Sequence, residues 1–176
     1  TVGDSNAVDL LVNGGGDLEI QVGGSLVKTT TAATLGDVVN GPHAIEVAGD
    51  GTDVITMNSL GTDLFDGLTV TAGGITIGGD LEIAGNISLT GPVTLASDVA
   101  LDTTMANGTV TVNGTVDGDG VATRNLTLTS GTAAVTVTGA IGATEALGTI
   151  LVSDAGTVDF DSTVGAADLR MTDADA

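Results

Sequence analysis

The chain has 176 residues, of which 41% are hydrophobic and only 1% aromatic, so we expect one domain with an aliphatic core. Three Lys and Arg residues stand against 23 Asp and Glu, and the net charge of −20 excludes binding to nucleic acid or to anionic membranes, which needs clustered cations. The chain has no cysteine for a disulfide framework, and no apolar run is long enough to span a membrane.

Residues 1–74 carry strand signals in an irregular form. Apolar residues alternate with polar ones from Leu18 to Val22, and the pentapeptide at residues 16–20, Gly-Asp-Leu-Glu-Ile, returns at residues 79–83. This repeat predicts that the first part of the chain is a degenerate version of the later part. The Thr- and Ala-rich residues 29–34 lack periodicity and are expected to form a loop or an excursion. Further strand candidates are Val8–Val12, Ile45/Val47, Val54/Ile55 and Leu68/Val70.

The hexad block, residues 75–105, is the most regular part of the chain. Each hexad has two apolar residues separated by one position, followed by a triplet of small or polar residues. The apolar pairs are Ile75/Ile77, Leu81/Ile83, Ile87/Leu89, Val93/Leu95 and Val99/Leu101. All ten have odd numbers and therefore share one face of an extended chain. Gly-Asp, Gly-Asn and Gly-Pro between the pairs are typical of turns, so we expect short strands that bend at each glycine.

Three longer units make up residues 108–176. They begin at Gly108, Gly131 and Gly156 and differ in length between their aligned apolar positions. Each unit predicts three short strands, which is the content of one turn of a three-sided coil, with insertions at one corner. The aligned positions are Val110/Val112, Val135/Val137 and Val158/Phe160, then Val116, Ile141 and Val164, and finally Leu126/Leu128, Ile150/Val152 and Leu169/Met171.

Short strands with regular bends and one apolar face predict an all-β fold, a β-solenoid over residues 1–176 as a single domain. No sustained helical periodicity is present, so we expect no significant helix. At ~20–25 residues per turn the chain would make about eight coils.

The hexads and the longer units resemble the repeat regions of large secreted bacterial surface proteins. These are the filamentous-haemagglutinin-like and autotransporter-passenger β-helices. The resemblance rests on residues 79–101 (GDLEIAGNISLTGPVTLASDVAL), 108–128 (GTVTVNGTVDGDGVATRNLTL) and 135–152 (VTVTGAIGATEALGTILV), and it covers residues 68–172. It implies a right-handed parallel β-helix, export, and adhesion or scaffolding at the cell surface.

Two Gly-rich acidic turns are candidate metal sites. Asp117 and Asp119 flank Gly118, and Asp50 and Asp53 flank Gly51-Thr52. Calcium prefers flexible clusters of hard oxygen ligands, so these four aspartates predict calcium binding. The alternative is that they are solvent-facing turn residues, because Asp-Gly is a common turn dipeptide. No other cofactor is expected, and His43 is interpreted as a loop residue because the chain has no second histidine and no cysteine.

We expect a non-enzymatic protein, because sugar-cleaving sites on β-helices generally use aromatic platforms and cations that are scarce here. The predicted function is structural: a segment or self-stacking subunit of an extracellular adhesin, sheath or filament, with other copies of itself as end-to-end partners. The alternative is a surface module that binds calcium or glycans through acidic loops. Because the chain begins with Thr1 rather than Met, we expect it to be part of a longer protein.

Overall fold

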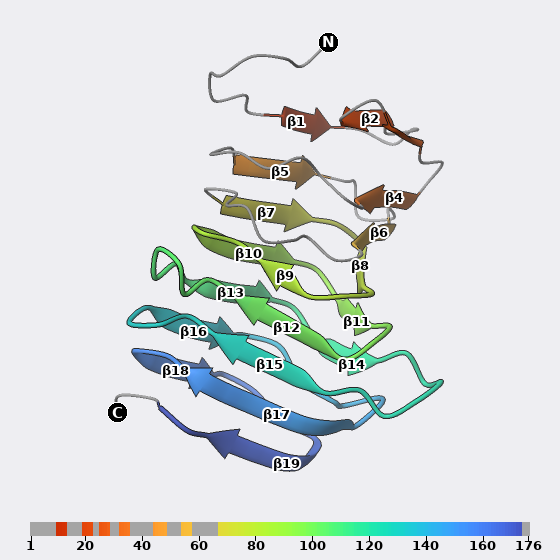
Figure 1. Ribbon diagram of the computed structural model, residues 1–176. Coiled ribbons are helices and arrows are strands. Elements are labelled where there is room, and N and C mark those ends of the chain that lie inside the picture. The colour runs from red at the N-terminus through yellow and green to blue at the C-terminus, as the bar shows by residue number, and fades with distance from the viewer. Residues whose placement is uncertain are drawn as a thin grey trace.

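Strands wound into a coil account for the regular structure of this chain. The computed structural model describes residues 10–13, 19–22, 25–28, 32–35, 44–48, 54–57 and 67–173. Within those ranges every helix or strand element is a strand, as the lack of helical periodicity predicts. The strands stack one above the other from the N-terminal end to the C-terminal end (Figure 1).

Three parallel sheets form the faces of the coil. The first sheet has seven strands, in the order β1 (Leu10–Asn13), β5 (Ala44–Ala48), β7 (Gly67–Thr71), β10 (Asn86–Thr90), β13 (Val110–Asn113), β16 (Ala134–Val137) and β18 (Thr157–Phe160). The second sheet has five, in the order β4 (Ala32–Leu35), β6 (Val54–Met57), β8 (Gly74–Ile77), β11 (Val93–Leu95) and β14 (Val116–Gly118). The third also has five, in the order β9 (Leu81–Glu82), β12 (Val99–Asp102), β15 (Leu126–Thr129), β17 (Leu147–Asp154) and β19 (Ala166–Met171).

One turn of the coil takes one strand from each sheet in sequence. β7, β8 and β9 make the first complete turn, and the last consists of β18, the bridge residue Val164 and β19. Five complete turns follow one another in residues 67–173, and the coil is right-handed (Figure 1). The molecule is therefore a right-handed parallel β-solenoid, as predicted.

The predicted number of coils, about eight, exceeds the five complete turns. One reason lies in the N-terminal part, where Leu10 pairs with Ile45, 35 residues further along the chain. That interval contains β2 (Glu19–Val22) and β3 (Ser25–Lys28), which pair with each other in antiparallel fashion. Of the repeated pentapeptide, Glu19 and Ile20 therefore lie in an antiparallel hairpin rather than in a strand of the parallel coil. Only Gly23 and Gly24 separate its strands, a length typical of hairpins.

The prediction of a loop at residues 29–34 is wrong in part. Ala32–Leu35 forms β4, which pairs in parallel with β6. The segment lacks clear apolar alternation, so no local pattern identifies it as a strand. The segment forms a strand because its backbone pairs with Val54–Met57. Here the tertiary context overrides the local sequence preference.

The predicted alignment of the three longer units is confirmed residue by residue. Val110 pairs with Val135, and Val135 pairs with Val158. Val116, Ile141 and Val164 form consecutive parallel bridges. Leu126 pairs with Ile150, and Ile150 pairs with Leu169.

The core is an aliphatic column inside the coil. All ten apolar residues of the hexads are buried, and none is more than 3% exposed. Each fully buried Leu, Ile or Val side chain contributes about 1.5–3 kcal/mol relative to leaving it in water. The column of inward residues that begins at Ile83 continues through two buried polar residues, Thr103 and Ser130. Both hydroxyls are satisfied, since Thr103 donates to the carbonyl of Gly108 and Ser130 to that of Ala133.

Candidate functional site: the acidic corner and the open end of the coil

The two candidate calcium ligands that the structure describes, Asp117 and Asp119, make separate contacts at the corner after the second sheet. Asp117 belongs to β14, and its Oδ1 accepts hydrogen bonds from the backbone N–H groups of Thr144 (2.8 Å) and Glu145 (3.2 Å) in the next turn. Asp119 instead binds within its own loop. The other two candidates, Asp50 and Asp53, lie outside the described residues, as does His43.

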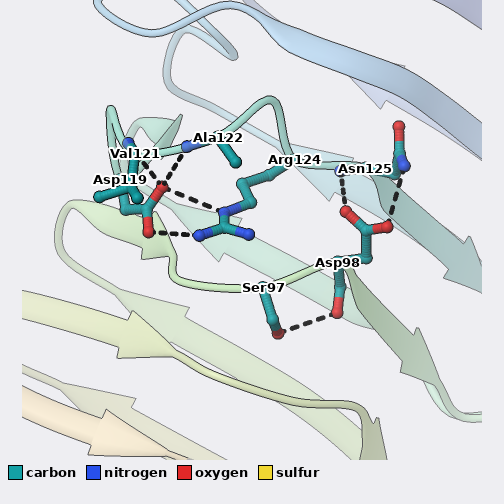
Figure 2. Close-up of polar contacts among 7 residues, drawn as sticks. All are labelled: Ser97, Asp98, Asp119, Val121, Ala122, Arg124 and Asn125. Carbon is teal, nitrogen blue, oxygen red and sulfur yellow. Dashed lines mark hydrogen bonds and ion pairs between the residues drawn. The ribbon is translucent and has the colours of Figure 1, made fainter.

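Arg124 binds both oxygens of the Asp119 carboxylate. Its Nε donates to Oδ1 at 3.0 Å and its second guanidinium nitrogen donates to Oδ2 at 2.6 Å, a bidentate ion pair. The backbone N–H groups of Val121 and Ala122 donate to the same Oδ1 (Figure 2). The pKa of Asp119 is lowered to about 2, mainly by the hydrogen bonds from Arg124 and to a smaller extent by these backbone donors. The loop between β14 and β15 is thus closed on itself by one acidic side chain.

A second set of polar contacts runs along the axis, immediately before the strands of the third sheet. Asp98 accepts hydrogen bonds from the backbone N–H (2.9 Å) and the side-chain amide (3.0 Å) of Asn125, one turn later (Figure 2). The backbone N–H of Asn125, followed by its side chain, holds the pKa of Asp98 below its usual value. Asn125 in turn accepts from the N–H of Thr149 at 2.8 Å. Asp80 accepts in the same way from the N–H of Ala100.

The corner before the first sheet repeats this arrangement with asparagines. The Oδ1 of Asn86 accepts from the N–H of Thr109, and that of Asn107 accepts from the N–H of Thr132 at 3.0 Å. The latter contact requires glycine at position 131, where the φ angle is 61° and a Cβ atom would lie 2.2 Å from Oδ1 of Asn107.

These axial contacts share one direction. In each pair the side-chain acceptor lies on the earlier turn and the backbone N–H donor on the later turn. The side chains therefore satisfy backbone donors at the corners, where the sheet ladders are interrupted. Chemically, this arrangement fixes the register of one turn on the next.

The C-terminal turn exposes side chains that earlier turns bury. Leu169 and Met171 are 45% and 49% exposed, whereas their partners in the preceding turn, Ile150 and Val152, are completely buried. Val158, Phe160, Val164 and Ala166 of the same turn are only partly buried. β18 and β19 are the last strands of their sheets, so each pairs on one side only within the described residues. We call this surface the open end.

Sequence reasoning missed the polar contacts between turns, although a signal was present. An Asp or Asn directly precedes the first inward residue of several strands, as in Asp80-Leu81, Asn86-Ile87 and Asn125-Leu126. We interpreted Asp80 and Asn86 as turn formers. The signal for the contacts is the return of Asp or Asn at the same corner one turn later, as at Asp98 and Asn125. Arg124 carried no such periodic signal.

Within the described ranges, no group of three or more His, Cys, Asp or Glu residues is placed to hold a metal ion. The same residues contain no helix of the length and apolar character needed to cross a membrane. The fold and these contacts define the class of the molecule, a parallel β-solenoid with polar corners. No protein-family model, curated protein or solved structure matches the chain.

Proposed function

We propose that this chain is a non-enzymatic structural unit of an extracellular protein, in which β-solenoid turns stack into a rod at the cell surface. Such a rod would serve as a segment or a self-stacking subunit of an adhesin, a sheath or a filament. The solenoid fold and the resemblance of residues 68–172 to secreted surface β-helices support the proposal. The observation that carries it is the open end.

The open end combines exposed apolar side chains with unpaired strand edges, which are the features that another turn of the coil would cover. Leu169 and Met171 continue the column of Ile150 and Val152, so a further turn in the same register would bury them. Complete burial of a fully exposed large apolar side chain yields about 1.5–3 kcal/mol, and covering the exposed half of Leu169 or Met171 yields roughly half of that. The free edges of β18 and β19 also offer backbone donors and acceptors to an added parallel strand.

Charge opposes the stacking of separate copies. Each copy carries a net charge of −20, so two copies repel each other at low ionic strength. Salt screens this repulsion, with a Debye length of about 10 Å at 0.1 M and about 3 Å at 1 M. Stacking through an apolar end is therefore expected to strengthen as salt is added, which is the opposite of the response of an assembly held by ion pairs.

Sedimentation velocity of the purified chain over a range of concentration and salt tests the proposal. We expect end-to-end oligomers that grow with added salt. The double variant Leu169→Asp/Met171→Asp should remain monomeric, whereas Val121→Asp, at a position 83% exposed in the loop between β14 and β15, should associate like the wild type. A wild-type chain that stays monomeric at every concentration and salt would contradict self-stacking.

A further inference from the structure

Two identical tripeptides, Asn107-Gly108-Thr109 and Asn113-Gly114-Thr115, lie close together in the chain but in different environments. Asparagine followed by glycine is the pair most prone to deamidation, because glycine has no side chain to hinder attack by its backbone nitrogen on the asparagine carboxamide. Such an attack requires a mobile carboxamide and a backbone N–H that is not held in a hydrogen bond. The structure satisfies these requirements at one of the two sites only.

Asn107 is locked at both reacting groups. Its Oδ1 accepts a hydrogen bond from the N–H of Thr132 at 3.0 Å, which fixes the carboxamide. The attacking nitrogen would be that of Gly108, and it donates to the carbonyl of Thr103 at 3.0 Å. Gly108 is also buried, whereas Gly114 is only half-buried. Reaction at Asn107 therefore has to wait for local opening of the corner.

Asn113 is open at both groups. It is the last residue of β13, and its side chain is exposed. Within residues 67–173 its carboxamide makes no hydrogen bond, and the N–H of Gly114 has no acceptor, although the carbonyl of Asn113 accepts from Gly91. Its neighbour on the outer face of the first sheet is Thr90, an uncharged side chain.

We propose that Asn113 is a site of spontaneous deamidation in the folded protein, and that the fold protects Asn107. The backbone nitrogen of Gly114 loses its proton to solvent and attacks Cγ of Asn113. The N–Cγ bond forms, the Cγ–Nδ2 bond breaks, and ammonia leaves, which produces a five-membered succinimide. Water then opens this ring at either carbonyl to give aspartate or isoaspartate. The net change is the uptake of one water and the loss of one ammonia, with no oxidant or reductant.

The two products have different consequences. Aspartate places a negative charge on the outer face of the first sheet, where β7, β10, β13 and β16 contain no charged residue. Isoaspartate lengthens the backbone by one carbon at a corner without spare room, since a Cβ atom at Gly114 would lie 2.1 Å from the carbonyl oxygen of Gly91. Isoaspartate at position 113 is therefore expected to loosen the connection between β13 and β14, whereas aspartate leaves the turn intact.

Peptide mapping by mass spectrometry tests the proposal, with the folded chain incubated at mildly alkaline pH and a parallel sample in urea. In urea the two identical tripeptides should react at similar rates. In the folded chain, deamidation at Asn107 should be slower than at Asn113 by a factor of about ten or more, because two hydrogen bonds must open first. Equal rates in the folded chain, faster reaction at Asn107, or protection of both sites would overturn the proposal.

Two variants keep the test independent of chain unfolding. Methylation by an isoaspartyl methyltransferase reports isoaspartate, and it is read on the peptide that contains position 113 because Asn13-Gly14 and Asn40-Gly41 can react as well. At this peptide the signal should rise with time in the folded wild type and be lost in Asn113→Gln. The variant Asn113→Asp should fold and melt like the fresh wild type, whereas aged wild type should melt lower in proportion to its isoaspartate. An undiminished methylation signal in Asn113→Gln would also overturn the assignment.

Discussion

Asp98 binds both amide groups of Asn125, the backbone N–H and the side-chain NH2, across one turn of the coil. The pair joins β12 to β15 at their N-terminal ends, where Val99 and Leu126 begin the paired stretch. The same type of contact recurs along the coil: a short polar side chain at a corner accepts a hydrogen bond from a backbone N–H group of the next turn.

Removal of this contact should weaken the solenoid without abolishing it. The substitution Asp98→Ala leaves the N–H of Asn125 without its acceptor, and we expect a loss of about 1 kcal/mol, a typical net value for a hydrogen bond at a partly hydrated site. Chemical denaturation measures the change. The control is Asp161→Ala, whose carboxylate makes no hydrogen bond within the described ranges and whose removal should have little effect. Equal losses in both variants would contradict the structural role of Asp98.

The pairing of Asp119 with Arg124 predicts a specific acid dependence. The pKa of Asp119 falls from 3.8 to about 2, so its contribution to stability is complete above pH 3.8 and is lost as the pH falls towards 2. Thermal melts of wild type and Arg124→Ala across this window should converge at the acidic end. The carboxylate chemical shift of Asp119 should titrate near pH 2 in the wild type and closer to 3.8 in the variant. A wild-type midpoint near 3.8 would contradict the ion pair.

The calcium hypothesis for Asp117 and Asp119 stays a prediction, which the variant Arg124→Gln tests sharply. In the wild type a calcium ion at Asp119 would have to displace the guanidinium of Arg124. The variant frees this carboxylate, and we expect it to bind calcium more tightly than the wild type does, as measured by calorimetry. A wild-type melting temperature that rises with calcium, but not with sodium chloride of equal ionic strength, would favour the binding module over the purely structural unit.

The inward register is tested by two adjacent substitutions in β9 and at its end. Ile83 is 1% exposed, so Ile83→Asp buries a charge without a partner and should unfold the coil, with a cost of several kcal/mol. Glu82 is less buried and belongs to the outward positions, so Glu82→Lys should leave the coil folded. Circular dichroism distinguishes the two outcomes. Equal tolerance of both substitutions would show that the register is wrong.

The sequence was sufficient to predict the solenoid and most of its core. Apolar alternation is a local property, and each of the ten apolar hexad residues could be assigned to the inward face because a strand has a period of two. The longer units also aligned correctly, because Val116, Ile141 and Val164 keep their place between two recognisable pairs. Periodic features were therefore readable from the chain.

Features that depend on a single long-range pairing could not be read. β4 lacks a pattern of its own, and the antiparallel hairpin β2–β3 has a sequence shared with a coil strand. The ion pair of Asp119 and Arg124 lies in a corner loop whose sequence is not repeated in the equivalent loop of the next turn, so no repeat could reveal it. The aspartates of this loop are compatible with calcium binding and with an ordinary Asp-Gly turn, and only the position of Arg124 shows which contact Asp119 makes.

The central claim is that the open end, with Leu169 and Met171, receives another turn of β-solenoid. Electron microscopy of the purified chain at high salt tests it most directly. We expect rods of constant width whose lengths are multiples of one unit, and whose elongation is lost in Leu169→Asp/Met171→Asp. Wild-type particles of a single length, or assemblies that widen by side-to-side association, would contradict it.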